Sequence, residues 1–178
     1  MKIFENAISD ELNQKCIEFI QKKISNRDFY YSSASTLRWS TDLIEGIIGS
    51  CHIMPTPANL GDEILESIGK IFPENDRKND IAIQFYIWDR LSGINWHDDG
   101  TYDYGITIYL NEYWDENWGG IFLWQDKTDD NQIKGLMPKK NTMVINDNYE
   151  EHCVTPVGVL YDMPRMTIQI FKRKVYED

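Results

Sequence analysis

The apolar residues in the first half of the chain follow a helical spacing in two segments. One segment starts after Ser9, whose hydroxyl can cap exposed backbone amides, and the other covers about residues 59–72 and ends at Pro73. Their apolar faces consist of Leu12, Cys16, Phe19 and Ile20 in the first, and of Leu60, Ile64, Leu65, Ile68 and Ile71 in the second. We therefore expect two amphipathic helices, with a looser segment between them in which His52 lies at the surface without a partner.

In the second half the spacing changes to the alternation that is typical of strands. The expected strands are 81–88, 104–111, 119–124, 141–146, 152–157 and 165–172. Alternation is clearest in the last of these, where one side carries Met166, Ile168 and Ile170. Gly, Asn, Asp and Pro cluster at the breaks between them. Helices followed by a run of short strands indicate an α+β protein with an antiparallel barrel or jelly roll.

The length of the chain limits how these elements can be divided. With 178 residues, of which 42% are hydrophobic, the chain can bury one core without disulfides or metals to hold it together. No repeat or long linker interrupts it. We expect a single domain over residues 1–178, with an N-terminal helical part at about 1–78 and the barrel at about 79–173.

Charge and cysteine content restrict the partners and the compartment. A net charge of −11 repels phosphate backbones, so nucleic acid is not expected as a partner. The three cysteines have no paired spacing, which indicates reduced thiols. The first twenty residues do not have the pattern of a secretory signal, and no apolar run is long enough to span a membrane. We expect a cytoplasmic protein without a membrane partner.

Two of the three histidines lie where strands begin or end. His97 opens the sequence His97-Asp98-Asp99, and His152 begins a later expected strand. Because side chains alternate along an extended backbone, His97 and Asp99 should lie on one side, with Asp98 pointing away. Two neutral imidazoles and one carboxylate can occupy one face of an octahedral Fe(II) and leave three positions open. The sequence therefore predicts a metal site formed by His97, Asp99 and His152.

A single arginine supports this site. Arg165 lies in an expected strand of otherwise uncharged residues, whereas the later Lys172 and Arg173 are expected at the surface. A buried arginine is costly unless it meets an anion in a fork-like pair of hydrogen bonds. The distal carboxylate of a dicarboxylic 2-oxo acid that chelates the metal would provide that anion.

The stretch from Ile81 to Phe171 resembles the 2-oxoglutarate-dependent oxygenase family, particularly its prolyl hydroxylase branch. The matching motifs are His97-Asp98-Asp99, Ile108-Tyr109-Leu110-Asn111, Trp114-Asp115, Gly119-Gly120-Ile121, Pro138-Lys139, His152-Cys153-Val154-Thr155-Pro156-Val157 and Arg165-Met166-Thr167-Ile168. The resemblance implies a double-stranded β-helix, a jelly-roll or cupin-like barrel supported by the N-terminal helices.

The resemblance also assigns the chemistry. It implies that His97, Asp99 and His152 ligate Fe(II), and that 2-oxoglutarate and O2 are consumed, with ascorbate as an accessory reductant. Relatives that halogenate lack the carboxylate ligand, so Asp99 implies oxygen transfer. The expected products are a hydroxylated substrate, succinate and CO2.

Three residues are expected to bind the cosubstrate. By the resemblance, Arg165 and Tyr109 hold the distal carboxylate of 2-oxoglutarate, and Tyr86 lines its pocket. The interval between His152 and Arg165 is a few residues longer than in the animal prolyl hydroxylases. Trp96 and Trp124 are expected to pack around the barrel.

The substrate is less determined than the cofactors. The leading expectation is a protein or peptide side chain, most favourably proline, in a basic segment attracted by acidic residues near the site (Asp98, Asp103, Glu112, Asp115 and Glu116). One alternative is hydroxylation of a free amino acid or other small molecule, and nucleic-acid demethylation is disfavoured by charge. A non-catalytic cupin-like binding domain is the alternative of another class.

Overall fold

The computed structural model describes residues 1–26, 39–71, 80–161 and 163–174. Its larger sheet has the strand order β1-β8-β5-β10-β3-β2, and its smaller sheet has the order β4-β9-β6-β7. The larger sheet consists of β1 (Lys2–Phe4), β2 (Cys51–Pro55), β3 (Ile81–Trp88), β5 (Tyr102–Tyr109), β8 (Met143–Asn146) and β10 (Arg165–Arg173). The smaller consists of β4 (Ile94–His97), β6 (Phe122–Asp126), β7 (Gln132–Leu136) and β9 (His152–Val154).

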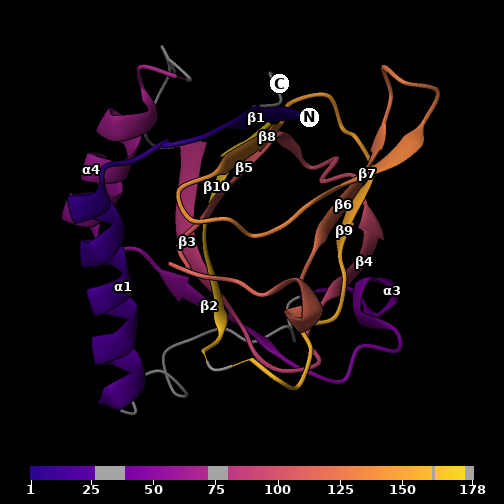
Figure 1. The fold of residues 1–178 in the computed structure, drawn as a ribbon. Helices are drawn as coiled ribbons and strands as arrows, with labels where there is room; N and C mark the ends of the chain where they lie inside the picture. The colour runs from indigo at the N-terminus through magenta and orange to yellow at the C-terminus, as the bar shows by residue number, and fades with distance from the viewer. Residues whose placement is uncertain (27–38, 72–79, 162, 175–178) are drawn as a thin grey trace.

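All strand pairs in both sheets are antiparallel, and the two sheets face each other across the interior (Figure 1). The helices α1 (Asp10–Ser25) and α4 (Ala58–Ile68) lie on the outer side of the larger sheet. Two short helices, α3 (Thr41–Ile44) and η3 (Glu116–Trp118), lie in connections. This is the expected α+β double-stranded β-helix with supporting N-terminal helices.

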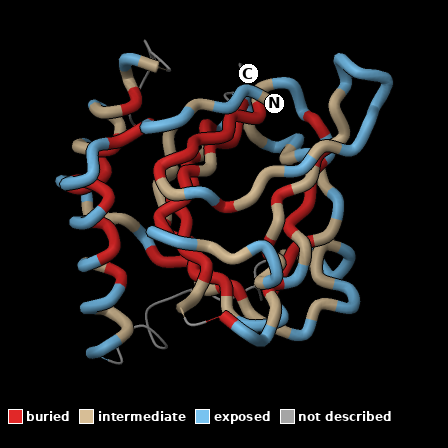
Figure 2. Tube along the Cα trace, in the orientation of Figure 1, coloured by how far each residue is buried: buried red, intermediate tan, exposed pale blue. Residues whose placement is uncertain are grey.

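The first helix begins where its sequence predicts. Ser9 is the N-cap of α1, and its hydroxyl accepts a hydrogen bond from the backbone N–H of Leu12 at 3.2 Å. One side of the helix is buried and the other exposed (Figure 2). The helix α4 ends at Ile68, earlier than expected, with Gly69 as its C-cap; Pro73 lies outside the described residues.

Alternation along β10 divides the protein into two packed regions. Met166, Ile168 and Ile170 point outward into the core beneath the helices. Arg165 and Gln169 point inward and line the cavity between the sheets. Because successive side chains of a strand point to opposite faces, one strand both anchors the helices and supplies the site.

The N-terminal part is not purely helical, since it contributes β1 and β2 to the larger sheet. His52 is not in a loop: it lies on β2, and its Nε2 is 2.8 Å from a carboxylate oxygen of Asp89.

Lys172 is buried rather than exposed, at 7% exposure. It occupies the outward face of β10, together with Met166, which is opposite to Arg165.

Among the described residues, no helix is both long and apolar enough to cross a bilayer. The cysteines Cys16, Cys51 and Cys153 are buried as free thiols.

One buried asparagine connects the start of the chain to the barrel. The side chain of Asn141 accepts a hydrogen bond from the backbone N–H of Ile8 at 3.2 Å and donates one to its carbonyl at 2.6 Å. Asn141 also has a left-handed φ of 63°, which asparagine tolerates better than most residues. This paired contact fixes the segment that leads into α1.

Asn141→Ala is therefore expected to lower the free energy of unfolding by about 2–4 kcal/mol, because it leaves two backbone groups of Ile8 unpaired. Urea denaturation of the metal-free protein measures the change. Asn131→Ala is the matched control, since Asn131 has a similar φ of 55° but is exposed. An equal loss in both variants would assign the effect to backbone strain alone.

Candidate functional site

A bulge in β4 brings His97 to the interior. The strand pairs with β9 through Ile94↔Val154 and His97↔His152, and its register shifts between these pairs. The bulge adds one residue, so Ile94 and His97 both point into the cavity although they are three positions apart. The two histidines thereby face each other from neighbouring strands, with ring centroids 4.2 Å apart.

Asp99 reaches the same point through a turn rather than through strand alternation. The strand ends at His97, and Asp99 adopts a left-handed φ of 56°. Its carbonyl accepts a hydrogen bond from the N–H of Tyr102 at 2.9 Å, which closes the turn. His97 and Asp99 therefore lie together as predicted, but the extended backbone from which this was predicted is wrong.

Three ligand atoms converge at this point. The Asp99 carboxylate oxygens lie 3.6 Å from Nε2 of His97 and 3.3 Å from Nε2 of His152. All three ligand atoms lie within 4.8 Å of one another. The Asp98 carboxylate instead accepts a hydrogen bond from the N–H of Gly100 at 2.9 Å. The cluster contains Asp99 and not Asp98.

Hydrogen bonds fix which imidazole nitrogen faces the carboxylate. Nδ1 of His97 donates to the backbone carbonyl of Asn95 at 2.8 Å, and Nδ1 of His152 donates to that of Glu150 at 2.9 Å. With the proton on Nδ1, each Nε2 presents a lone pair toward Asp99. In both cases the acceptor is the carbonyl two residues earlier in the chain.

The electrostatics favour metal binding. Burial and the neighbouring His152 lower the pKa of His97, so its ring is neutral at pH 7. Burial opposes ionisation of Asp99, but the contacts of its carboxylate with His152 and His97 outweigh burial and hold its pKa below its usual range. Two neutral imidazoles and one carboxylate are the donor set of an open Fe(II) site.

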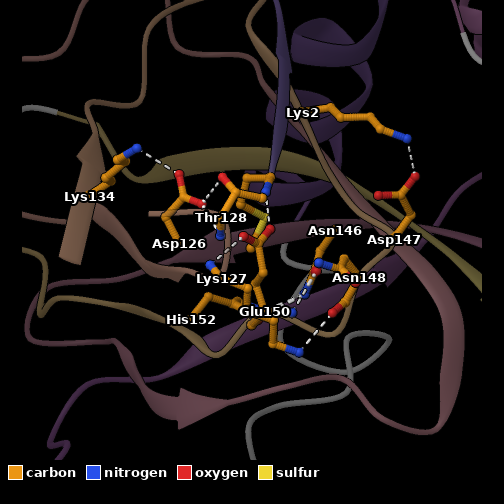
Figure 3. Close-up of polar contacts among 11 residues, drawn as sticks. Lys2, Asp126, Lys127, Thr128, Lys134, Asn146, Asp147, Asn148, Glu150 and His152 are labelled. Atoms are coloured by element: carbon orange, nitrogen blue, oxygen red, sulfur yellow. Dashed lines mark hydrogen bonds and ion pairs between the residues drawn. The ribbon is translucent and has the colours of Figure 1, made fainter. Parts of the chain in front are cut away.

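The carbonyl that orients His152 is itself held in place (Figure 3). The side chain of Asn146 accepts from the N–H of Glu150 at 3.0 Å and donates to its carbonyl at 3.1 Å. The buried Glu150 carboxylate accepts from the N–H of Lys127 at 3.2 Å and contacts the amino group of Met1. The loop before β9 is thus fixed to the end of β6.

A cavity of about 350 Å³ lies between the sheets and is lined by the three clustered residues and by Arg165. Arg165 is 1% exposed, and its guanidinium carbon is 5.3 Å from the ring centroid of Trp88 and 5.2 Å from that of Tyr109. Stacking on two aromatic faces favours a guanidinium over an ammonium. The side chain is held rigidly within the barrel.

The polar atoms around Arg165 fit a carboxylate. Within the described part of the chain, Nε and Nη1 of Arg165 and the hydroxyl of Tyr109 have no hydrogen-bond partner. A buried cation without an anion is strongly unfavourable, and burial accordingly lowers the pKa of Arg165. These donors suit the distal carboxylate of a dicarboxylic acid whose other end reaches the metal.

The two predicted tyrosines occupy different positions. Tyr86 lines the cavity, and its ring lies 6.1 Å from those of Trp39 and Trp88. Tyr109 is fully buried beside Arg165 and is not among the residues lining the cavity. Burial raises its pKa to about 12, so its hydroxyl is a proton donor at all relevant pH values.

Two of the sequence motifs, those that contain Asn111 and Gly120, position Arg165. Asn111 donates to the carbonyl of Pro164 at 2.9 Å and accepts from the N–H of Met166 at 2.7 Å, bracketing the arginine on both sides. Gly120 has a φ of 62°, and a Cβ there would lie 2.9 Å from Cδ of Arg165. Only glycine permits both this backbone and this approach.

Sequence reasoning missed Asn95, Asn146 and the contribution of α3 to the cavity. The Nδ1 acceptors are main-chain carbonyls, for which no side chain gives a signal. Of the two tryptophans expected to pack around the barrel, Trp124 is buried, while Trp96 is 39% exposed; neither lines the cavity.

The sequence profile of the 2OG-Fe(II) oxygenase superfamily matches residues 82–173. Three solved structures, each 14% identical, show the same fold over 97% of this chain. A Pseudomonas putida prolyl-4-hydroxylase has a TM-score of 0.69, with 92% of its chain covered. A prolyl hydroxylase from Trichoplax adhaerens, in complex with a hypoxia inducible factor oxygen degradation domain peptide fragment, has 0.67 with 82% covered. A prolyl 4-hydroxylase from Phytophthora capsici has 0.62 with 58% covered.

No curated protein matches the sequence. The superfamily match spans more than half of the chain and contains the clustered residues and Arg165. The chain therefore belongs to the 2OG-Fe(II) oxygenase superfamily, with Fe(II) and 2-oxoglutarate as its cofactors and His97, Asp99 and His152 as its HxD…H triad.

Proposed function

We propose that the protein hydroxylates a side chain of a protein or peptide, with proline as the favoured residue. The observation that carries the proposal is similarity to prolyl hydroxylases over 97% of the chain, one of them bound to a peptide. Because this similarity is at 14% identity, the substrate rests on fold analogy, whereas the cofactors rest on the superfamily match.

The residues around the cavity would have three roles in such a reaction: binding the metal, binding the cosubstrate and excluding water. His97, Asp99 and His152 would hold Fe(II), and Arg165 with Tyr109 would hold the distal carboxylate of 2-oxoglutarate. With both bound, the site supplies oxidation by O2, in which 2-oxoglutarate becomes succinate and CO2 and one oxygen atom enters a C–H bond. Tyr86, Trp88 and the other cavity walls exclude water and fix the geometry.

The acidic residues favour a basic peptide, but fewer of them than the sequence predicts are near the cavity. Asp98 lines it, and the exposed Asp103 lies on β5, which contributes to its walls. Glu112, Asp115 and Glu116 instead border a separate depression together with two lysines. The proposed attraction of a basic segment therefore rests on Asp98 and Asp103, and it should weaken as salt rises.

Mass spectrometry of proteins from cells that express the enzyme tests the proposal. The comparison sample comes from cells expressing Asp99→Ala. A gain of one oxygen on proline in a peptide segment, absent from the comparison sample, is the expected result. Oxygen on another residue type, or on a free metabolite, would refute the prolyl assignment and leave the superfamily membership intact.

Tyr109→Phe is expected to raise the Michaelis constant for 2-oxoglutarate about fivefold, since one neutral hydrogen bond contributes about 1 kcal/mol and about 1.4 kcal/mol corresponds to a factor of ten. Succinate formation at increasing 2-oxoglutarate measures the constant. Tyr104→Phe is the control, because Tyr104 is buried in the core beneath the helices. An unchanged constant in Tyr109→Phe would exclude the hydroxyl from cosubstrate binding.

A further inference from the structure

The strand that carries His97 also holds α3 beside the cavity. Asn95 accepts the Nδ1 hydrogen bond of His97 through its backbone carbonyl, at 2.8 Å. Its side-chain amide donates to the backbone carbonyls of Asp42 at 3.0 Å and Glu45 at 3.1 Å. One residue therefore contacts a metal ligand through its main chain and the short helix through its side chain.

The helix α3 depends on such outside contacts. It has four residues, too few for internal hydrogen bonds alone to stabilise it. It lies next to β4, the edge strand of the smaller sheet, where no further strand is paired among the described residues (Figure 1). Both N–H groups of the Asn95 amide reach α3, one to a carbonyl within it and one to the carbonyl of its C-cap residue.

The segment around α3 forms part of the cavity wall. Trp39, Ser40 and Leu43 all line the cavity. The ring of Trp39 packs against the rings of Trp88 at 5.6 Å and Tyr86 at 6.1 Å, both on β3 of the larger sheet. The segment is thus anchored to one sheet by Trp39 and to the other by Asn95.

We propose that Asn95 is a positioning residue that couples this cavity wall to the metal site. A displacement of α3 would move the Asn95 side chain that is hydrogen-bonded to it. Because the carbonyl of Asn95 orients His97, the same movement would change the orientation of this metal ligand. The coupling is reciprocal, so metal binding that fixes His97 also stiffens α3. This inference rests on the superfamily membership and the triad, and it does not depend on which substrate is hydroxylated.

Asn95→Ala removes both side-chain donors and keeps the backbone carbonyl. In the metal-free protein, the N–H groups of Leu43 and Ile47, which bond to Ser40 and Ile44, are expected to exchange with deuterium at least about tenfold faster. The dissociation constant for Fe(II), measured without oxygen, is expected to rise about three- to tenfold. That is less than the about 10- to 100-fold typical of a lost direct partner, because the carbonyl itself remains.

Two further variants separate positioning from general stability. Asn95→Gln keeps both donors on a longer side chain and should restore part of the exchange protection and of the Fe(II) affinity. Asn117→Ala is the matched control, since Asn117 is exposed and its side-chain amide bonds only to Asp115 in the contacts described. It should leave both measurements at their wild-type values. If Asn95→Ala does not fold, Asn95→Ser, which retains one donor, replaces it.

The reciprocal measurement uses Mn(II) as a redox-inert probe. Saturating Mn(II) should slow exchange at Leu43 and Ile47 in the wild type, and this protection should be lost in Asn95→Ala. Two results would overturn the coupling. One is faster exchange at Leu43 and Ile47 in Asn95→Ala with an unchanged dissociation constant for Fe(II), and the other is unchanged exchange at these residues. None of these measurements uses a substrate. A failure to find hydroxyproline would therefore refute the prolyl assignment without affecting the test of Asn95.

Discussion

Asp99→Ala is expected to reduce Fe(II)-dependent succinate formation by more than about 100-fold, beyond the about 10- to 100-fold typical of residues that only orient metal ligands. The carboxylate is the one anionic member of the triad, and its oxygens lie within 3.6 Å of both imidazole Nε2 atoms. Its removal leaves two neutral ligands for a dication. Succinate formation with Fe(II) in excess measures the loss, and Fe(II) binding without oxygen shows its cause.

Asp98→Ala is the matched control. The two aspartates are adjacent, but the Asp98 carboxylate bonds to the N–H of Gly100 and is exposed. This variant should retain most of the activity. Loss of activity in Asp98→Ala, together with survival of Asp99→Ala, would reverse the ligand assignment.

Arg165→Ala is expected to raise the Michaelis constant for 2-oxoglutarate at least about tenfold, because a charge-assisted hydrogen bond contributes about 1.5–3 kcal/mol and about 1.4 kcal/mol corresponds to a factor of ten. The guanidinium is the buried cation of the cavity wall and has two nitrogens without partners in the described chain. Steady-state kinetics with 2-oxoglutarate as the varied cosubstrate measures the change.

Truncation of Arg165 also removes packing between Trp88 and Tyr109, so a second variant is needed. Arg165→Met keeps much of the side-chain volume without the charge and should show the same rise in the Michaelis constant. Arg90→Ala is the control, because Arg90 lies over the Tyr161 ring at 5.2 Å and donates to the Tyr161 carbonyl. A wild-type constant in Arg165→Met would move the carboxylate contact to another residue.

The elements that the sequence predicts well are those whose own residues determine them. The helix after Ser9 has a cap and a continuous apolar face, and β10 has strict alternation because its two faces meet different surroundings. The short strands β1, β2, β4 and β7 have no such pattern. They are strands because a neighbouring strand supplies their hydrogen bonds, which is a property of the tertiary structure.

The features of the site likewise include some that the sequence predicts and others that it does not. The triad and Arg165 were predictable because their side chains carry the chemistry, and they lie around one cavity. The turn at Asp99 was not predicted, since a left-handed φ at an aspartate leaves no periodic signal. Likewise, its charge predicts an exposed Lys172, but this residue lies in β10 and is buried.

The pairing of His97 with His152 across β4 and β9 has a consequence for how the protein acquires iron. These strands are distant in sequence, so no short segment of the chain contains all three ligands. During synthesis, a chain that has emerged only as far as β8 offers His97 and Asp99 but not His152. Metal capture must therefore follow the closing of a long-range strand pair. The metal that enters is then selected by the finished geometry, after a period in which the growing chain presents only a weak, two-ligand site.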